Sequence, residues 1–419
     1  MFQTLKNAWA IEEIRRKILY TLLILFIVRL GCYVPVPGVD VEFVSKQVAN
    51  SGILGFMNMI SGGAIGYFTL FALGVGPYIT ASIIMNLLQV AIPALERLTK
   101  EGEEGRRKIA QYTRRFTVVL AFAQAMAIIL SLGPDAVTTT HWFNYVTIGI
   151  LLTAGALIVM WMGERITEKG IGNGISLIIF TGIVARVPQQ IITLVSNATM
   201  DATLIWTIPA FAVVILLIIT GVTFIDLGER RIPVQYAKRV VGRKMYGGQS
   251  THIPIKVNSS GVLPLIFAMT LIQFPGMIAQ FWPNSGFYNW YNTWMGSSSP
   301  IYLTLLALLI VFFTYFYTTI SFNPVEISKN MQQNGGFIPG IRPGKPTSDH
   351  LAKISSRITL FGAIFLAVIA VIPAMISGFL GIKLVFGATS VLIMVSVALE
   401  TNRQLDAQML MRSYKGFLK

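Results

Sequence analysis

Ten apolar segments separated by polar loops constrain the fold of this chain more than any other feature of its sequence. A helix needs about 20 apolar residues to cross the hydrocarbon core of a bilayer. The segments are of about this length and cover residues 18–34, 71–92, 116–132, 143–162, 175–195, 205–225, 262–281, 301–320, 358–376 and 384–399. Only 12% of the residues are charged, against about 25% in soluble proteins. The sequence therefore predicts an all-α polytopic membrane protein with ten transmembrane helices.

Lysine and arginine are distributed unevenly over the loops between these segments. The loops alternate between the two sides of the membrane, and 29 of the 33 basic residues fall on the side that also holds both termini. Only Lys46, Arg186 and Lys383 fall on the other side, and Arg29 falls within a segment. Because cytoplasmic loops carry an excess of Lys and Arg, we predict that both termini are cytoplasmic. The net charge of +15 follows from this topology, and it is also compatible with anionic partners such as lipid head groups or ribosomal RNA.

The number of segments also predicts how the chain is divided. If the ten segments form two sets of five, the odd number inserts the second set upside down relative to the first. We therefore predict two inverted halves, residues 1–200 and 201–419. Inverted repeats around a midplane site are common in transporters, so a secondary transporter of a small solute is one hypothesis and a channel is another.

Glycines interrupt the apolar stretch of residues 55–93. Gly62, Gly63, Gly66, Gly74 and Gly76 each weaken a helix by roughly 1 kcal/mol relative to alanine. Residues 71–93 suffice for a span, which leaves residues 55–69 as a short, soft piece. Broken structure at membrane depth is tolerated only where protein or a water-filled cavity surrounds it. We expect a cavity with this piece lying in it.

Two long loops on the cytoplasmic side, residues 226–261 and 321–357, predict a docking function. In the first, alternating Ile232, Val234 and Tyr236 indicate a strand, and residues 253–257 alternate back after a turn at Gly247 and Gly248. The second is built of Gly and Pro with few apolar anchors. Loops of this length are usually functional or disordered, and a cytoplasmic partner is the preferred interpretation.

The segments contain few residues that can perform chemistry. Arg29 lies inside a segment, where it serves a function, or is held by backbone carbonyls, or snorkels to the interface. The chain has one cysteine, Cys32, and no HExxH, GxSxG or P-loop motif. We therefore predict no catalytic residues, no metal and no cofactor, which argues against an intramembrane enzyme. The near absence of intramembrane charge and the long loops favour a channel over a transporter.

Several long motifs resemble the SecY family, whose members are channel subunits of the bacterial protein-conducting translocon. The motifs occur in order through nearly the whole chain: YVPVPGVD (residues 33–40), ISGGAIGYFTLFALGVGPYITASII (60–84), GERITEKGIGNGISLIIFTGIVA (163–185), QYAKRVVGRKMYGGQSTHIPIKVN (235–258), FNPVEIS (322–328) and GFIPGIRPGKPT (336–347). The resemblance implies ten spans in two inverted halves of five around a central, hourglass-shaped pore, hinged between spans 5 and 6.

The resemblance also implies a set of functional residues. A ring of apolar side chains closes the pore: Ile79, Ile83, Ile179, Ile266 and Ile393, with Ile175 as the next candidate. A plug at about residues 55–67 fills it and includes Met57, Met59, Ile60, Gly62, Gly63, Ile65 and Gly66. A lateral gate between spans 2–3 and 7–8 includes Asn86, Thr270, Gln273 and Phe274. An apolar constriction excludes ions by dewetting, and isoleucine offers a passing chain no hydrogen-bond partner.

The partners implied by the resemblance act from the cytoplasm and within the membrane. They are the SecE and SecG subunits, the SecA motor ATPase, the ribosome, preprotein and signal-sequence substrates, and membrane lipids. Arg243, Lys244 and Arg342 match the loop residues that dock SecA and the ribosome. The implied location is the bacterial plasma membrane, and the implied function is to conduct unfolded preproteins and release membrane segments sideways into lipid.

Overall fold

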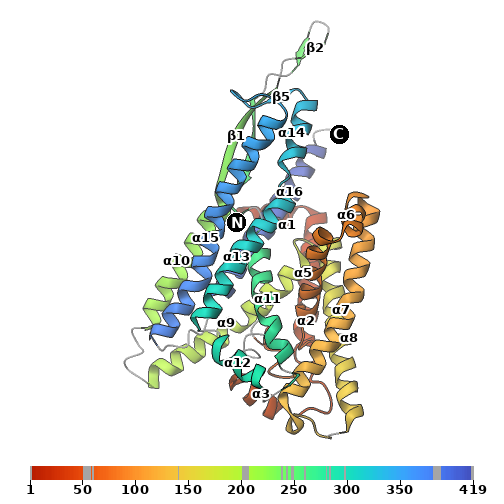
Figure 1. Cartoon of the computed structure of the whole chain (residues 1–419), viewed down its shortest axis with the longest axis vertical. Helices are drawn as coiled ribbons and strands as arrows, with labels where there is room; N and C mark the ends of the chain where they lie inside the picture. Colours follow the sequence, from red (N-terminus) through yellow and green to blue (C-terminus); the bar gives the residue numbers. More distant parts are fainter. Residues whose placement is uncertain are drawn as a thin grey trace.

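The computed structural model of the chain is an elongated bundle of helices with a small sheet at one end (Figure 1). It describes residues 2–416 apart from residues 51–57, 59–60, 140, 201–206, 237–238, 242–243, 247–249, 259–260, 280, 283–284, 297–298 and 381–387. The expected hinge between spans 5 and 6 therefore lies partly outside the described residues, at residues 201–206.

Each of the ten apolar segments predicted from the sequence coincides with a helix. These helices are α2 (Glu12–Gly31), α5 (Gly76–Ala91), α7 (Glu103–Leu132), α8 (Trp142–Lys169), α9 (Gly174–Met200), α10 (Thr207–Leu227), α11 (Leu263–Ala279), α13 (Pro300–Ser321), α15 (Lys345–Leu380) and α16 (Ala388–Gly416). Within the described residues, four stretches are long and apolar enough to cross a membrane, in α7, α8, α13 with α14, and α15. A fifth is the pair of α5 and α6 (Pro93–Lys100), which is bent by 103°. Ten membrane spans remain a prediction.

The short helices mark the two ends of the bundle. They are α1 (Phe2–Ala10), α3 (Val41–Asn50), the 3-10 helix η1 (Pro134–Ala136), α12 (Gly286–Trp294) and α14 (Pro324–Gln333). In Figure 1, α3 and α12 lie at the bottom, whereas α14 and the strands lie at the top. Because α3 and α12 come from loops predicted outside and α14 from a loop predicted inside, this arrangement agrees with the alternation of loops.

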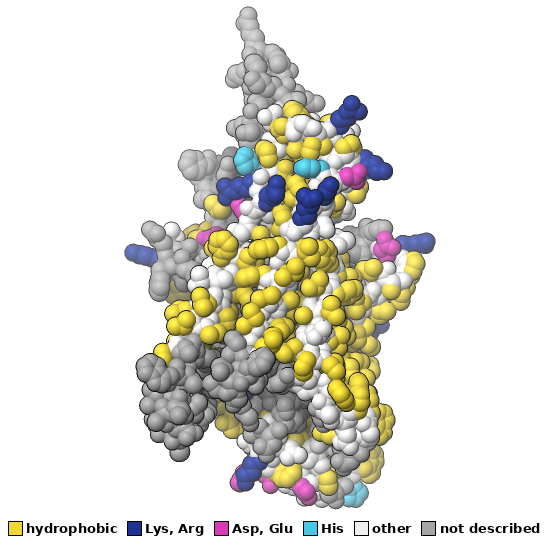
Figure 2. Space-filling model, turned by 60° about the vertical axis from the view of Figure 1, so that its left-hand side comes forward, with side chains coloured by type: hydrophobic (Ala, Val, Ile, Leu, Met, Phe, Trp, Pro, Cys, Tyr) yellow, Lys and Arg dark blue, Asp and Glu magenta, His cyan; other side chains and the backbone are white. Residues whose placement is uncertain are grey.

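The surface of the bundle suits a lipid environment. Figure 2 shows hydrophobic side chains in a broad band across the middle of the molecule, with most Lys and Arg side chains above it, toward the sheet. Large apolar side chains of the helices are strongly exposed, among them Phe26, Leu308 and Phe224, which is 76% exposed. A continuous exposed apolar surface of this kind indicates contact with lipid or a partner.

Helix α5 begins later than the sequence predicted. The expected start at Phe71 is wrong, since the helix begins at Gly76 and residues 70–75 form turns. Gly74 adopts φ +53°, which interrupts the helix and favours glycine. The turn packs closely on α8, where a side chain at Gly155 would collide with the Leu70 carbonyl oxygen.

The two long cytoplasmic loops combine into one small body. Strand β1 (Glu229–Tyr236) pairs antiparallel with β4 (Ser250–Lys256), with Ile232 opposite Ile253, and with β5 (Gly336–Phe337) on its other edge. Strands β2 (Arg239–Val241) and β3 (Lys244–Tyr246) form a separate hairpin beyond it. The predicted hairpin is confirmed, although its predicted turn at Gly247 and Gly248 lies outside the described residues. An all-α fold class is therefore incomplete, because the chain carries this sheet.

The body has an apolar core of its own. We call β1, β4, β5, α14 and the first part of α15 the sheet body. Its buried side chains come from both loops: Ile232, Val234, Ile255, Met331, Ile338 and Leu351. The expectation of few apolar anchors in residues 331–347 is therefore wrong, because Met331 and Ile338 fill this core. Its base is tied to the end of α10, since Asn258 Nδ2, just after β4, donates to Asp226 Oδ1 at 2.6 Å. The Arg403 guanidinium of α16 donates to the Asp226 carbonyl and so joins α16 to the same point.

Candidate pore and plug site

Two cavities meet at the centre of the bundle, and three isoleucines separate them. The larger cavity has a volume of about 410 Å³ and the smaller about 60 Å³. Ile79 of α5, Ile179 of α9 and Ile266 of α11 are the residues that line both. Because the same three side chains border two separate spaces, they form an apolar constriction between them. We call these residues the constriction.

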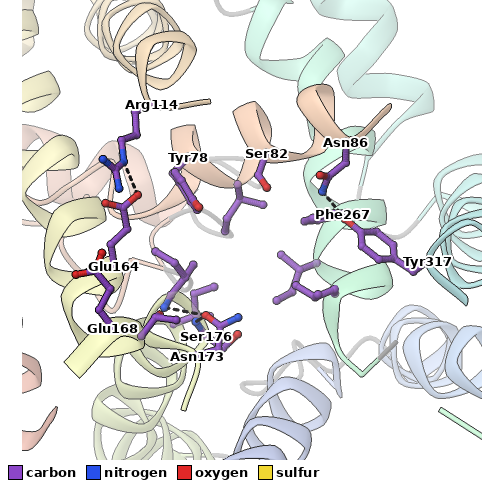
Figure 3. Close-up of a pocket in the computed structure, with 16 residues that line it drawn as sticks. Tyr78, Ser82, Asn86, Arg114, Glu164, Glu168, Asn173, Ser176, Phe267 and Tyr317 are labelled. Carbon is purple, nitrogen blue, oxygen red and sulfur yellow. Dashed lines mark hydrogen bonds and ion pairs between the residues drawn. The ribbon is translucent and has the colours of Figure 1, made fainter. Parts of the chain in front are cut away.

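Polar side chains surround the larger cavity (Figure 3). Tyr78, Ser82 and Asn86 point from α5, and Arg114 of α7 meets Glu164 of α8, with 2.8 Å between Nε and Oε1. On the opposite wall, Asn173 caps α9, since its Oδ1 accepts hydrogen bonds from backbone N–H groups at the start of that helix. The charged wall residues come from helix ends predicted to be cytoplasmic. The larger cavity therefore lies on the side of the sheet body.

The smaller cavity lies on the other side of the constriction. It is bordered by Ser61 and Ile65 of the predicted plug, by Gly74 and Gly76 before α5, and by Met269, Thr270 and Gln273 of α11. A third space of about 20 Å³ lies between Arg29, Ser61 and Gly182, and it shares Ser61 and Ile179 with the smaller cavity. Described residues of the glycine-broken piece thus border these cavities. That the whole piece lies in a cavity stays a prediction.

The five isoleucines of the predicted ring lie in one apolar cluster but differ in position. Ile79, Ile179 and Ile266 form the constriction, and Ile393 of α16 lines the smaller cavity. Ile83 lines neither cavity and is 2% exposed, so it packs behind Ile79 on the same face of α5. Ile175, the next candidate, lines the larger cavity. Their role as a ring stays a prediction.

The plug residues that the structure describes form a compact turn. Met57, Met59 and Ile60 lie outside the described residues, whereas Gly62, Gly63, Ile65 and Gly66 lie within them. We call residues 61–67 the plug turn.

Asn58 organises this turn, a role that no sequence pattern indicated. The Gly63 N–H donates to the Asn58 carbonyl at 2.8 Å, and the Gly66 N–H donates to Asn58 Oδ1 at 2.8 Å. Asn58 is buried, and its side chain replaces hydrogen bonds that a continuous helix would have supplied. Gly62 and Gly63 adopt φ +69° and +98°, a conformation that favours glycine.

The predicted lateral-gate residues lie on α5 and α11 but do not all meet. Asn86 Nδ2 donates to the Tyr317 hydroxyl of α13 at 2.9 Å. Thr270 donates to the carbonyl of Ile266 in its own helix, and Gln273 lines the smaller cavity. No sequence pattern indicated a role for Tyr317, because a tyrosine in an aromatic run gives no periodic signal. Phe267 of α11 packs on its ring, with 5.0 Å between centroids.

Two of the three predicted docking residues, Lys244 and Arg342, lie at the sheet end of the molecule. Arg243 lies outside the described residues, and the backbone of Lys244 begins β3. Arg342 is exposed, and its carbonyl accepts a hydrogen bond from Thr347 at 2.8 Å, which fixes the turn between β5 and α15. Among the described residues, no group of three or more His, Cys, Asp or Glu side chains is placed to hold a metal ion.

This architecture defines a class of membrane protein. A bundle of apolar helices that encloses two cavities on either side of an apolar constriction is that of a channel or a transporter. Comparison with known proteins identifies the family within this class. A model of the SecY family matches residues 69–402, and the chain belongs to the SecY family.

Relatives and solved structures agree with this assignment. The chain is 44% identical to protein translocase subunit SecY of Halalkalibacterium halodurans, with all of both chains covered. It is 42% identical to the SecY subunit of Thermotoga maritima, over 100% of this chain and 98% of that one. Its fold is similar to a solved protein-conducting channel, with a TM-score of 0.67 at 20% identity over 94% of this chain and 92% of the other. It is also similar to Sec61 of a canine ribosome–channel complex, with a TM-score of 0.62 at 18% identity over 94% and 92%.

Proposed function

We propose that this chain is the channel-forming subunit of a protein translocase, which conducts unfolded preproteins across the plasma membrane. The constriction carries this proposal: Ile79, Ile179 and Ile266 come from three helices and border both cavities. The names of the full-length relatives, protein translocase subunit SecY, support it.

The chemistry of the constriction suits a substrate of any sequence. Side chains without hydrogen-bonding groups do not hold a passing backbone, and an apolar neck stays dry when no chain is in it. A transporter of a small solute instead needs polar groups that recognise that solute at the narrowest point. The polar groups that line the larger cavity, such as Arg114 and Glu164, are not part of the constriction, because they do not border the smaller cavity.

Topology and sideways release belong to the same proposal. The ten helices form two inverted halves of five with both termini in the cytoplasm, and α5, α7, α11 and α13 border the lateral gate. Within the described residues, the hydrogen bond between Asn86 and Tyr317 is a polar contact that joins α5 to α13. Polar contacts between membrane helices contribute only about 0.6–2 kcal/mol each, so an entering apolar signal sequence can displace this one.

The partners follow from the family and from the sheet body. SecE and SecG complete the membrane complex, and the SecA ATPase or the ribosome drives transport from the cytoplasmic side. The sheet body, with exposed Arg342, is the docking surface. The similarity of the fold to Sec61 in a ribosome–channel complex supports the ribosome as one of these partners.

Reconstitution tests the function directly. The chain is placed in vesicles with its SecE and SecG partners, and SecA, ATP and a secretory precursor are added. We expect ATP-dependent accumulation of protease-protected precursor. No protection under conditions in which an established translocase is active would reject the proposal, and uptake of a small solute without precursor would favour the transporter.

Docking is tested separately with a charge reversal at Arg342. Arg342→Glu is expected to weaken binding of SecA or ribosomes severalfold, more strongly at low salt, because exposed charges act within a Debye length of about 10 Å. Arg357→Glu, in α15, is the control for loss of positive charge alone. Equal weakening by both substitutions would mean that net charge, and not Arg342, determines docking.

A further inference from the structure

We propose that Arg29 is the latch that holds the plug turn in its closed position. This inference rests on the proposed function, since it assigns a regulatory residue to the plug of the same channel. The Arg29 guanidinium lies inside the bundle and reaches the backbone of the plug turn. The constriction does not require this contact.

Arg29 extends from the last turn of α2 to Gly62, 33 positions further along the chain. Its Nη1 donates a hydrogen bond to the Gly62 carbonyl oxygen at 3.2 Å. The side chain is half-buried and lines the small space that also borders Ser61 and Gly182. Hydrogen bonds from a charged donor are stronger than those between neutral groups, and this one is partly shielded from water. It therefore fixes the plug turn to a helix of the bundle.

The absence of a side chain at Gly62 leaves room for this contact. A Cβ at position 62 would collide with Arg29 Nη1 and would lie 2.8 Å from the Cα of Gly182 in α9. The plug turn is thus held between α2 and α9 by close approach of backbone, which only glycine permits there. The neighbouring Gly63 has a similar positive φ, but a Cβ there would meet nothing closer than Arg186 Nε at 3.7 Å. The tight fit is therefore specific to position 62.

A second contact joins Arg29 to the far end of the plug turn. The guanidinium lies over the ring of Tyr33 at 5.8 Å from its centroid, and the Tyr33 ring lies 6.3 Å from that of Tyr67. Cations over aromatic faces are attracted by the ring quadrupole. One arginine thus contacts the first part of the plug turn directly and its last residue through Tyr33.

These contacts favour the closed position of the plug turn but still allow the plug turn to move out of it. A single hydrogen bond to a neutral carbonyl fixes a position without the desolvated ion pair that would make release slow. Loss of a hydrogen bond to a charged group shifts a two-state equilibrium about ten- to a hundredfold. Removal of the Arg29 guanidinium should therefore raise the open population of the resting channel by at least about tenfold.

The test measures resting ion conductance of the full chain with its partner subunits in planar bilayers, without substrate. Arg29→Met is compared with the unaltered chain, with Arg29→Lys, and with deletion of residues 55–67. We expect Arg29→Met to raise the conductance about tenfold, Arg29→Lys to raise it less, and Arg29→Met to add nothing in the deleted channel.

The outcomes separate the latch from the plug itself. Increased conductance on deletion, with none in Arg29→Met, would reject the latch and leave the proposed channel intact. No increase in either variant would count against the plug as well. An equal increase from Arg29→Met with and without residues 55–67 would overturn the latch, because Arg29 would then act elsewhere in the pore.

A matched glycine pair keeps the test decisive if Arg29→Met does not insert. Gly62→Ala and Gly63→Ala introduce the same methyl group at adjacent positions with positive φ, so they share backbone strain. Only the first displaces Arg29 and Gly182. We expect Gly62→Ala to raise the conductance clearly more than Gly63→Ala, and equal effects would overturn the latch.

Discussion

The centre of the bundle and the sheet body are held together in different ways. At the centre, the constriction separates two cavities, and the plug turn is kept in place by a few hydrogen bonds and close glycine contacts. In the sheet body, β1 is paired on both edges and Val234 is fully buried in a packed apolar core. Packed cores are rigid, whereas regions with cavities and few contacts open at low cost.

The difference corresponds to what each region must do in the proposed channel. A closed pore must open for each substrate, so its closure depends on contacts that are individually weak. A docking surface must keep its shape while a motor or ribosome acts on it, so it is built as a small domain. Substitutions at the centre of the bundle should therefore raise the open population of the resting channel. Substitutions in the core of the sheet body should instead unfold that part of the chain.

The largest expected effect comes from breaking the sheet body. Val234→Asp places an unpaired carboxylate in the core, which costs about 3–5 kcal/mol. We expect the sheet body to unfold locally, visible as rapid cleavage within residues 226–261 by limited proteolysis, with loss of SecA-driven transport. Resting ion conductance should stay unchanged, because the constriction lies in the bundle.

Gln235→Asp is the matched control for this substitution. It introduces the same charge one position along β1, where the side chain is exposed. Resistance to protease should be retained in Gln235→Asp and lost in Val234→Asp. Equal resistance in both would show that the core of the sheet body contributes little to its stability.

The sheet body also shows how far local sequence patterns reach. Alternation in β1 and β4 predicted their pairing, and the register confirms it, with Arg230 opposite Ile255. The third strand was not predicted, because β5 is only two residues long and lies in a stretch rich in Gly and Pro. Met331 and Ile338 looked isolated in sequence, and only the folded chain brings them under β1.

The centre of the bundle was predictable in kind but not in detail. Apolar length located the ten helices, and the spacing of Ile79 and Ile83 placed them on one face of α5. The contacts that close the site join residues far apart in the chain, such as Arg29 with Gly62 and Asn86 with Tyr317. No periodicity encodes such pairs. The late start of α5 depends on the backbone conformation of Gly74, which an apolar run does not reveal.

A smaller effect is expected at the constriction. Ile79→Asn replaces an apolar side chain that borders both cavities with one that retains water. Excluding isoleucine from water contributes about 2 kcal/mol, so we expect resting ion conductance to rise by about an order of magnitude while the sheet body stays resistant to protease. Ile79→Leu, which keeps the apolar surface, should leave conductance nearly unchanged. If asparagine and leucine gave the same conductance, apolarity at this position would not close the channel.

The smallest effect is expected at the weak polar contact of the proposed lateral gate. Tyr317→Phe removes the hydroxyl that accepts from Asn86, and a hydrogen bond between membrane helices contributes only about 0.6–1.7 kcal/mol. Sideways opening should become roughly threefold to twentyfold more favourable, measured as transport of precursors with defective signal sequences. Tyr315→Phe is the control, because the Tyr315 hydroxyl donates to the Ser356 carbonyl of α15, on another side of the same helix.

Asn86→Leu should have no further effect in the Tyr317→Phe background, since each substitution removes the same hydrogen bond. Additive effects would mean that Asn86 and Tyr317 act through different partners, and the seam would then be closed by packing between α5, α11 and α13 rather than by this contact.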